Sequence, residues 1–285
     1  MREKFDAAWL ELREDVDHRS RAAGLLPPLR RWWTARGRSA VLDLGCGTGS
    51  NLRYVAPELP GPQTWTLLDH DPELLARIEA PSGDVLMKPL RGDLAETGLE
   101  EVGRAHLVTA SALLDLVSRP WLGALVDACA DAGCGALFAL TYDGTVEWSG
   151  DDDPFDALVR EAVNEHQRRD KGLGPALGPT AGRSAEELFR RRGYRTWLTP
   201  SPWTLGPSEA TLARALLAGW AAAATEQRPG EEAGVRRWAE RRGAAVGRGD
   251  FRLVVGHVDL LALPTADPAA NPRADPRGDA TADAS

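Results

Sequence analysis

The sequence predicts an α/β fold built on a doubly wound, mostly parallel sheet. Five short apolar runs alternate with helix-compatible segments, which is typical of a parallel sheet with helices on both faces. The expected strands are residues 39–44, 64–69, 84–88, 105–111 and 135–142. Two turns support this fold, since the first run leads into the glycine-rich segment 45–49 and the second run ends in Asp69. Ligands of such sheets bind at the carboxyl ends of the strands, so these turns predict a ligand site.

The glycine-rich turn predicts a site for a nucleotide-like cofactor. Glycine at positions 45, 47 and 49 allows positive φ and lets a ligand approach backbone N–H groups. The helix that follows leaves its first N–H groups unpaired, which favours polar or anionic ligand groups. The spacing Asp43-x-Gly-x-Gly-x-Gly differs from a dinucleotide fingerprint and from a P-loop, and the turn has no lysine or arginine for a pyrophosphate. Asp69 follows about 20 residues later, where an acid can bind ribose hydroxyls.

Four segments, in order along the chain, resemble the motifs of the class I S-adenosylmethionine-dependent methyltransferases. They are the first motif at 43–49, the ribose-binding strand end at 67–75, the adenine-edge motif at 92–94, and the fourth strand with its loop at 105–114. The resemblance is close over residues 38–142, although His106 stands where many members carry an acid. It implies a Rossmann-like fold with a seven-stranded, mostly parallel sheet and an antiparallel last strand. It also implies S-adenosyl-L-methionine as methyl donor and S-adenosyl-L-homocysteine as product.

The resemblance further implies which residues hold the cofactor. The glycine turn presents its backbone to the amino-acid end, Asp43 orders that turn, and the two oxygens of Asp69 accept from the two ribose hydroxyls. Asp93 accepts from the adenine amino group while the N–H of Leu94 donates, and Ser111 lies beside the sulfonium. The expected cofactor residues are Asp43, Gly45, Cys46, Gly47, Gly49, Asn51, Asp69, His70, Asp93, Leu94 and Ser111.

Two segments are longer than the bare fold needs, namely residues 144–183 and 200–249. In this family both leave from the carboxyl edge of the sheet, where ligands bind, so we expect them to form a helical cap over the substrate. We therefore expect an N-terminal helical segment, 1–37, that covers the cofactor site, and a methyltransferase domain at 38–264. The last residues, 265–285, contain no large apolar side chain, and we expect them to be disordered.

Methyl transfer from a sulfonium needs little from the protein beyond alignment and exclusion of water. A base is required only if the acceptor is protonated and weakly nucleophilic. Three residues near the expected site are catalytic candidates: Asp115, His166 and Tyr142. Each has a structural alternative, because Asp115 also suits a helix cap or surface acid, Tyr142 also suits a strand-end turn, and a lone histidine on a helix is often exposed.

Four residues are candidates for substrate binding: Asp143, Asn164, Lys171 and Trp203. Asn164, Lys171 and His166 are expected to form a polar cluster for an anionic substrate. Trp203 has two interpretations of equal weight, an aromatic wall of the substrate site or a filler of the cap core. Arg19 and Arg21 are either ligands of the cofactor carboxylate or solvated surface residues.

Composition favours a small-molecule substrate. The net charge of −8 argues against a nucleic-acid partner. No apolar run is long enough to span a bilayer, and three unpaired cysteines (Cys46, Cys129 and Cys134) fit a reducing cytoplasm. We expect O- or N-methylation of a metabolite, with no metal ion. The Ala- and Leu-rich helix 212–224 packs within the cap or against a second copy, so a homodimer is possible. The alternatives are a macromolecular methyltransferase, acting on RNA or protein, and a cofactor-binding protein without methyl transfer.

Overall fold

The computed structural model describes residues 6–35, 37–81, 83–150 and 152–265. Nearly all of the tail predicted to be disordered therefore lies outside the described residues. The strands are β1 Ala40–Leu44, β2 Gln63–Asp69, β3 Val85–Arg91, β4 Leu107–Ser111, β5 Gly135–Trp148, β6 Tyr194–Pro200, β7 Trp203–Leu205 and β8 Leu253–Pro264. The α-helices are α1 Ala7–Ser20, α2 Leu26–Thr34, α3 Ser50–Val55, α4 Pro72–Leu75, α5 Leu99–Val102, α6 Arg119–Ala132, α7 Pro154–Gln167, α8 Ala181–Arg191, α9 Ala210–Gln227 and α10 Glu232–Arg248.

The sheet has the order β3-β2-β1-β4-β5-β8-β6, with β7 paired to β8 beyond this path. Strands β1 to β5 pair in parallel, while β8 lies antiparallel to both β5 and β6. The predicted class I fold, a seven-stranded path whose last strand is antiparallel, is confirmed. The short strand β7 is an addition that the sequence did not predict.

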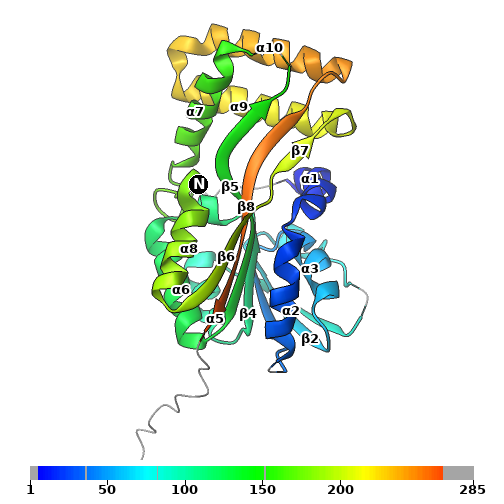
Figure 1. Cartoon of the computed structure of the whole chain (residues 1–285), viewed down its shortest axis with the longest axis vertical. Coiled ribbons are helices and arrows are strands. Elements are labelled where there is room, and N and C mark those ends of the chain that lie inside the picture. Colours follow the sequence, from blue (N-terminus) through cyan, green and yellow to red (C-terminus); the bar gives the residue numbers. More distant parts are fainter. Residues whose placement is uncertain (1–5, 36, 82, 151, 266–285) are drawn as a thin grey trace, which may run out of the picture.

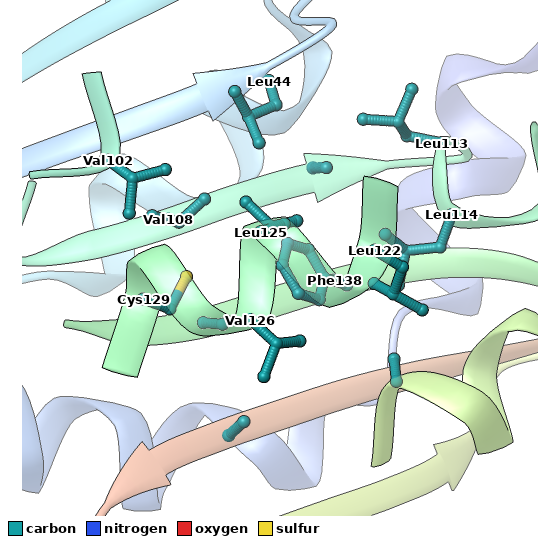
Figure 2. Packing of buried hydrophobic residues seen from close by; sticks show 14 of the residues in the cluster. Leu44, Val102, Val108, Leu113, Leu114, Leu122, Leu125, Val126, Cys129 and Phe138 are labelled. Atoms are coloured by element: carbon teal, nitrogen blue, oxygen red, sulfur yellow. The ribbon is translucent and has the colours of Figure 1, made fainter. Parts of the chain in front are cut away.

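Helices cover both faces of the sheet because the strands carry apolar side chains on both sides. On one face, α6 begins at Ser118, whose Oγ accepts from the Trp121 N–H, and it ends at Gly133 with φ 64°. Figure 2 shows Leu122, Leu125 and Val126 of this helix beside Phe138 of β5. Each such fully buried side chain contributes about 1.5–3 kcal/mol of transfer free energy. On the other face, α2 and α3 bury a second cluster that includes Trp33 and Leu52.

Two strands extend beyond the sheet and support a cap at one end of the molecule (Figure 1). The sequence predicted that the fifth strand ends at residue 142, but β5 continues to Trp148, which pairs with Leu253 of β8. The pairing shifts register between Phe138 and Thr141, and Leu140 has a φ of 52°. Such irregularities bend a strand and hide it from a pattern of alternating residues. The bend carries β5 and β8 away from the parallel sheet.

We use the word cap for β7, the outer ends of β5 and β8, and helices α7, α9 and α10. These helices share a core that contains Val159, Leu217, Val235 and Trp238. In Figure 1 the cap lies above the sheet, and α1 lies between them at one side. The expected division of the chain at residues 37 and 264 stays a prediction. Among the described residues, none of the helices has the length and apolar character needed to cross a membrane.

Candidate functional site

A pocket opens where β1, β2, β3 and β4 end at their carboxyl edge. Its wall includes most of the residues that the sequence assigned to the cofactor: Asp43, Gly45, Cys46, Gly47, Asn51, Asp69, His70, Asp93, Leu94 and Ser111. Gly49 is the exception, because it lies outside the wall and precedes the first turn of α3 with a φ of 83°. The structure thus brings together residues that are up to 68 positions apart, from Asp43 to Ser111.

The glycine turn has a backbone conformation that favours glycine at its centre. Gly45 and Gly47 have φ values of 64° and 54°, in the left-handed region that L residues rarely adopt. A Cβ on Gly47 would lie 3.0 Å from Cδ1 of Leu10, which belongs to α1. The turn therefore exposes backbone to the pocket and lies in close contact with the N-terminal helix.

Asp43, a residue of the pocket wall, has one buried carboxylate oxygen without a hydrogen bond in the described part of the chain. Its Oδ1 accepts from Nδ2 of Asn51 at 2.8 Å and from Oγ1 of Thr109 at 2.7 Å. Its Oδ2 is buried and has no hydrogen-bond partner among the residues that the structure describes. Burial raises the pKa of Asp43 to about 6, against the opposing hydrogen bonds from Asn51 and Thr109. Burial makes the ionised form of Asp43 unfavourable in free energy. A positively charged ligand group beside it would offset that cost.

Asp69 is fixed by the turn that it faces. Its Oδ2 accepts from the Gly47 N–H at 2.9 Å, and its Oδ1 accepts from the Asp71 N–H at 2.9 Å. Each carboxylate oxygen can accept a second hydrogen bond, so these contacts orient the group without using all of its lone pairs. His70 lies beside it, with Nδ1 at 3.2 Å from Oδ1 of Asp69. The arrangement suits a ligand with neighbouring hydroxyl groups.

Asp93 begins the next helical turn. Its Oδ1 accepts from the Glu96 N–H at 2.8 Å, which leaves this carboxylate at the pocket edge beside Leu94. The site thus combines a glycine turn, a buried carboxylate with one oxygen that has no hydrogen bond among the described residues, an oriented carboxylate at the end of β2, and an acid after β3.

The comparisons with known proteins agree with this geometry. Residues 41–134 match the family model described as a methyltransferase domain. Over this stretch, about a third of its length, the chain is therefore similar to methyltransferase domains. No curated protein matches the sequence.

Several solved structures are similar to the chain at low sequence identity. One is a SAM-dependent methyltransferase from Geobacter sulfurreducens in complex with S-adenosyl-L-homocysteine, at 15% identity, covering 91% of this chain and 98% of that chain with a TM-score of 0.41. Another is a SAM-dependent methyltransferase from Thiobacillus denitrificans in complex with the same molecule, at 16% identity, covering 91% and 99% with a TM-score of 0.40. A third is the YcgJ protein from Bacillus subtilis, at 14% identity, covering 87% and 100% with a TM-score of 0.43.

The wall of the pocket also includes three residues of α1 that the sequence did not indicate: Leu10, Arg13 and Asp17. Nε and Nη2 of Arg13 donate to the two carboxylate oxygens of Asp17 at 2.8 and 3.2 Å. An Arg–Asp pair four residues apart is common on solvated helices, so its sequence carries no signal of a site.

Ion pairs and hydrogen bonds hold α1 over the glycine turn. Nε2 of His18 lies 3.0 Å from Oγ of Ser50, at the start of α3. Nε of Arg53, also on α3, donates to Glu14 at 2.7 Å, and its Nη1 donates to the Thr48 carbonyl at 2.7 Å. The helix is thus attached to the turn at several points along its length.

Arg21 and Arg19 do not reach the pocket wall. Nη1 of Arg21 donates to Oδ1 of Asn51 at 2.9 Å, and its Nε lies 3.4 Å from Oδ2 of Asp259 on β8. The side chains of Arg21 and Asp259 are both buried. Arg19 instead pairs with Glu209 at 3.0 Å. The surface interpretation therefore fits Arg19, and Arg21 supports the site from behind through Asn51, which in turn holds Asp43.

Of the predicted substrate residues, the structure brings only Lys171 to the pocket wall, beside Gly172 and Leu173. Asn164 instead accepts from the Tyr142 hydroxyl at 2.8 Å and donates to the Gly144 carbonyl at 3.1 Å. These bonds connect α7 to β5. The predicted cluster of Asn164, His166 and Lys171 is therefore not assembled at the pocket. Asp143 accepts from the Thr145 N–H at 2.9 Å, within the part of β5 where the pairing shifts register between Tyr142 and Val146.

The three predicted catalytic residues also lie off the pocket wall. Burial raises the pKa of Tyr142, and the carboxylates of Asp143 and Asp115 raise it further, so its phenol stays protonated and is a poor base. His166 lies in the cap, with Nε2 at 3.4 Å from Glu226. Asp115 is buried after β4, close enough to act on Tyr142 electrostatically. Their roles in catalysis stay predictions that the geometry does not favour.

Trp203 lies behind the pocket wall and touches it through Asp17. The tryptophan is 3% exposed, and its Nε1 donates to Oδ1 of Asp17 at 3.0 Å. Its ring lies 4.8 Å from that of His257 on β8. Burial lowers the pKa of His257 to about 3, so this histidine is neutral. The position of Trp203 fits the interpretation that it fills the cap core better than the interpretation of an aromatic wall.

Proposed function

We propose that this domain transfers a methyl group from S-adenosylmethionine to an oxygen or nitrogen atom of a small-molecule metabolite. The observation that carries the proposal is the buried Oδ2 of Asp43, which lacks a hydrogen bond among the described residues and belongs to a residue that lines the pocket beside Gly45 and Gly47. A cofactor with an ammonium group at one end and vicinal hydroxyls further along fits the positions of Asp43 and Asp69.

Each part of the cofactor has a residue suited to it. Oδ2 of Asp43 would accept from the ammonium of the methionine moiety, Asp69 from the ribose hydroxyls, and Asp93 from the adenine amino group, with Leu94 and His70 beside the ring. When bound, the sulfonium supplies a methyl group that is already activated for displacement. The protein's own part is to bind, to orient and to keep water out.

The enclosure of the pocket supports a small acceptor. Helix α1 contributes Leu10, and the segment after α7 contributes Leu173, so the wall has parts on both sides of the opening. Leu113, Leu116 and Val117 add apolar surface after β4. A large RNA or protein would need an open, usually basic, approach, whereas this chain has a net charge of −8. A homodimer and a cytoplasmic location stay predictions.

Isothermal titration calorimetry with S-adenosyl-L-homocysteine tests the cofactor half of the proposal. The wild type is expected to bind, and Asp69→Ala is expected to bind at least about 10-fold more weakly, since it loses a charge-assisted contact. Asp15→Ala is the control, because Asp15 is exposed on α1. Equal affinity of the wild type and Asp69→Ala would contradict the assignment of Asp69.

The acceptor half is tested by incubating the enzyme with S-adenosylmethionine and a metabolite panel and measuring S-adenosyl-L-homocysteine. Product with a metabolite supports the proposal. Product only with RNA or protein fractions would favour the macromolecular alternative, and binding without product in any fraction would favour a protein that binds the cofactor without methyl transfer.

A further inference from the structure

Among the described residues, Asp17 is the one carboxylate of the pocket wall to which the proposed function assigns no part of the cofactor. Four carboxylates line the pocket, and three of them, Asp43, Asp69 and Asp93, have a part of the cofactor assigned to them. Asp17 is 7% exposed, and its buried charge is paired with Arg13 at the wall of the pocket. Asp17 is therefore the candidate carboxylate for a contact with the methyl acceptor.

The contacts of α1 place Asp17 above the glycine turn. Leu10, two turns before it, would touch a Cβ on Gly47 at 3.0 Å, and His18, immediately after it, bonds to Ser50. Asp17 thus faces the amino-acid end of the proposed cofactor. The other part of the roof lies at the adenine end, because Leu173 packs against the same cluster as Leu94. The sulfonium belongs to the methionine moiety of the cofactor. An acceptor between Asp17 and this moiety would therefore lie close to the methyl group that is transferred.

Asp17 is held rigidly by two neighbours. Arg13 donates two hydrogen bonds to it, and Nε1 of Trp203 donates a third to Oδ1 at 3.0 Å. The guanidinium of Arg13 also lies over the Trp203 ring, 5.0 Å from its centroid. Burial raises the pKa of Asp17 above its ordinary value, although Arg13 opposes this. Arg13 and Trp203 are thus positioning residues for a carboxylate that has more proton affinity than an exposed one.

The charges of the pocket wall select among acceptors. Four carboxylates face the two cations Arg13 and Lys171, so the wall is negative, and the proposed cofactor adds a net single positive charge. A carboxylate or phosphate on the acceptor would meet more repulsion than attraction, whereas an amine would be attracted. The neighbouring Leu113, Leu116 and Val117 suit an apolar skeleton around that amine.

We infer, on the basis of the proposed function, that Asp17 binds the methyl acceptor and that the acceptor is a primary or secondary amine on an apolar skeleton. The Asp17 carboxylate holds the amine by a charge-assisted hydrogen bond and receives a proton from its ammonium form. The freed nitrogen lone pair forms the N–C bond to the methyl carbon while the C–S bond breaks, with its electron pair going to sulfur. The proton leaves Asp17 for water.

Sinefungin provides a probe that needs no knowledge of the acceptor. In this analogue of S-adenosylmethionine an amine-bearing carbon replaces the methyl-bearing sulfur, so its amine lies where the transferred methyl would be. Calorimetric titrations with sinefungin and with S-adenosyl-L-homocysteine are compared for each protein. The wild type is expected to prefer sinefungin by about 10-fold or more, the value of one charge-assisted hydrogen bond. Equal or weaker binding of sinefungin by the wild type would overturn the inference.

Three variants separate the role of Asp17 from general damage. Asp17→Asn keeps an acceptor for the Trp203 N–H and is expected to lose the preference for sinefungin while binding S-adenosyl-L-homocysteine within about 3-fold of the wild type. Asp17→Glu keeps the charge and is expected to retain a preference. Asp15→Asn, on the exposed side of α1, is the matched control and is expected to behave as the wild type. Thermal unfolding establishes that each variant is folded.

The possible outcomes are distinct. Loss of affinity for both ligands in Asp17→Asn would show that Asp17 binds the part that they share, which overturns the inference and leaves the proposed function intact. An unchanged preference in Asp17→Asn would also overturn it, since the carboxylate would then not face the methyl position. Failure of the wild type to bind either ligand would overturn the proposed function itself, and the inference with it.

Discussion

Replacing Asp43 by asparagine is expected to stabilise the protein while weakening cofactor binding. The carboxylate is fully buried, and burial raises its pKa from 3.8 to about 6. A group with a higher pKa in the folded state binds its proton more tightly there. Its contribution to stability is therefore fully present below pH 3.8 and is lost as the pH rises to about 6.

The expected magnitude follows from that difference in pKa. At about 1.4 kcal/mol for each pKa unit, the ionised Asp43 costs the fold about 3 kcal/mol above the higher pKa. An asparagine keeps an oxygen for the bonds from Asn51 and Thr109, but its amide N–H groups replace the open Oδ2 and cost about 1–2 kcal/mol if they find no acceptor. The net gain of Asp43→Asn is then about 1–2 kcal/mol near pH 8 and close to zero or negative near pH 4.

Urea unfolding of the ligand-free protein at these two pH values measures the gain, with Asp15→Asn as an exposed control that is expected to change little. Calorimetry on the same samples should show affinity for S-adenosyl-L-homocysteine reduced by about 10-fold or more, because the charge opposite the ammonium is lost. A variant less stable than the wild type near pH 8, or a stability difference that does not change with pH, would refute the reasoning about Asp43.

Three further substitutions probe the surroundings of the pocket. Arg21→Met leaves the buried Asp259 carboxylate without the guanidinium of Arg21 beside it. Urea unfolding should therefore show a free energy of unfolding lower by about 3–5 kcal/mol. A decrease below about 1 kcal/mol would mean that the pair is not buried as described. Gly47→Ala forces an L residue to a φ of 54° beside Leu10 and should reduce affinity for S-adenosyl-L-homocysteine in calorimetry, at a stability cost of about 1–2 kcal/mol; wild-type affinity would contradict the description of the turn. His166→Ala should leave that affinity unchanged, since His166 lies in the cap beside Glu226, and a strong loss would place this histidine at the cofactor after all.

The sequence was informative where backbone conformation determines the residue type. Gly45 and Gly47 both have a positive φ, which favours glycine, so their spacing could be recognised without a structure. Asp43 and Asp69 lie at the carboxyl ends of buried strands, and these ends meet at one edge of a parallel sheet. The family resemblance gave the seven-stranded, mostly parallel sheet with its antiparallel last strand. These features depend on local chain geometry, which the sequence reports directly.

The sequence was less informative where function depends on contacts between distant segments. Asp17 joins the pocket because α1 is attached to the glycine turn and because Trp203, almost two hundred residues later, donates to it. Neither contact leaves a local pattern. Tyr142 was predicted from its place at the end of the fifth strand, and His166 from its place on a helix of the expected cap. The structure directs both side chains to partners in the cap or at its base. The bend near Leu140, which extends β5 into the cap, was equally invisible because it interrupts strand periodicity.

A crystal structure of the protein with S-adenosyl-L-homocysteine tests the central claim most directly. The account predicts that the ligand's ammonium lies within hydrogen-bond distance of Oδ2 of Asp43, with the ribose hydroxyls at Asp69 and the adenine beside Leu94. Ligand bound elsewhere, or bound here with its ammonium directed away from Asp43, would contradict the claim that this buried carboxylate is kept charged for the cofactor.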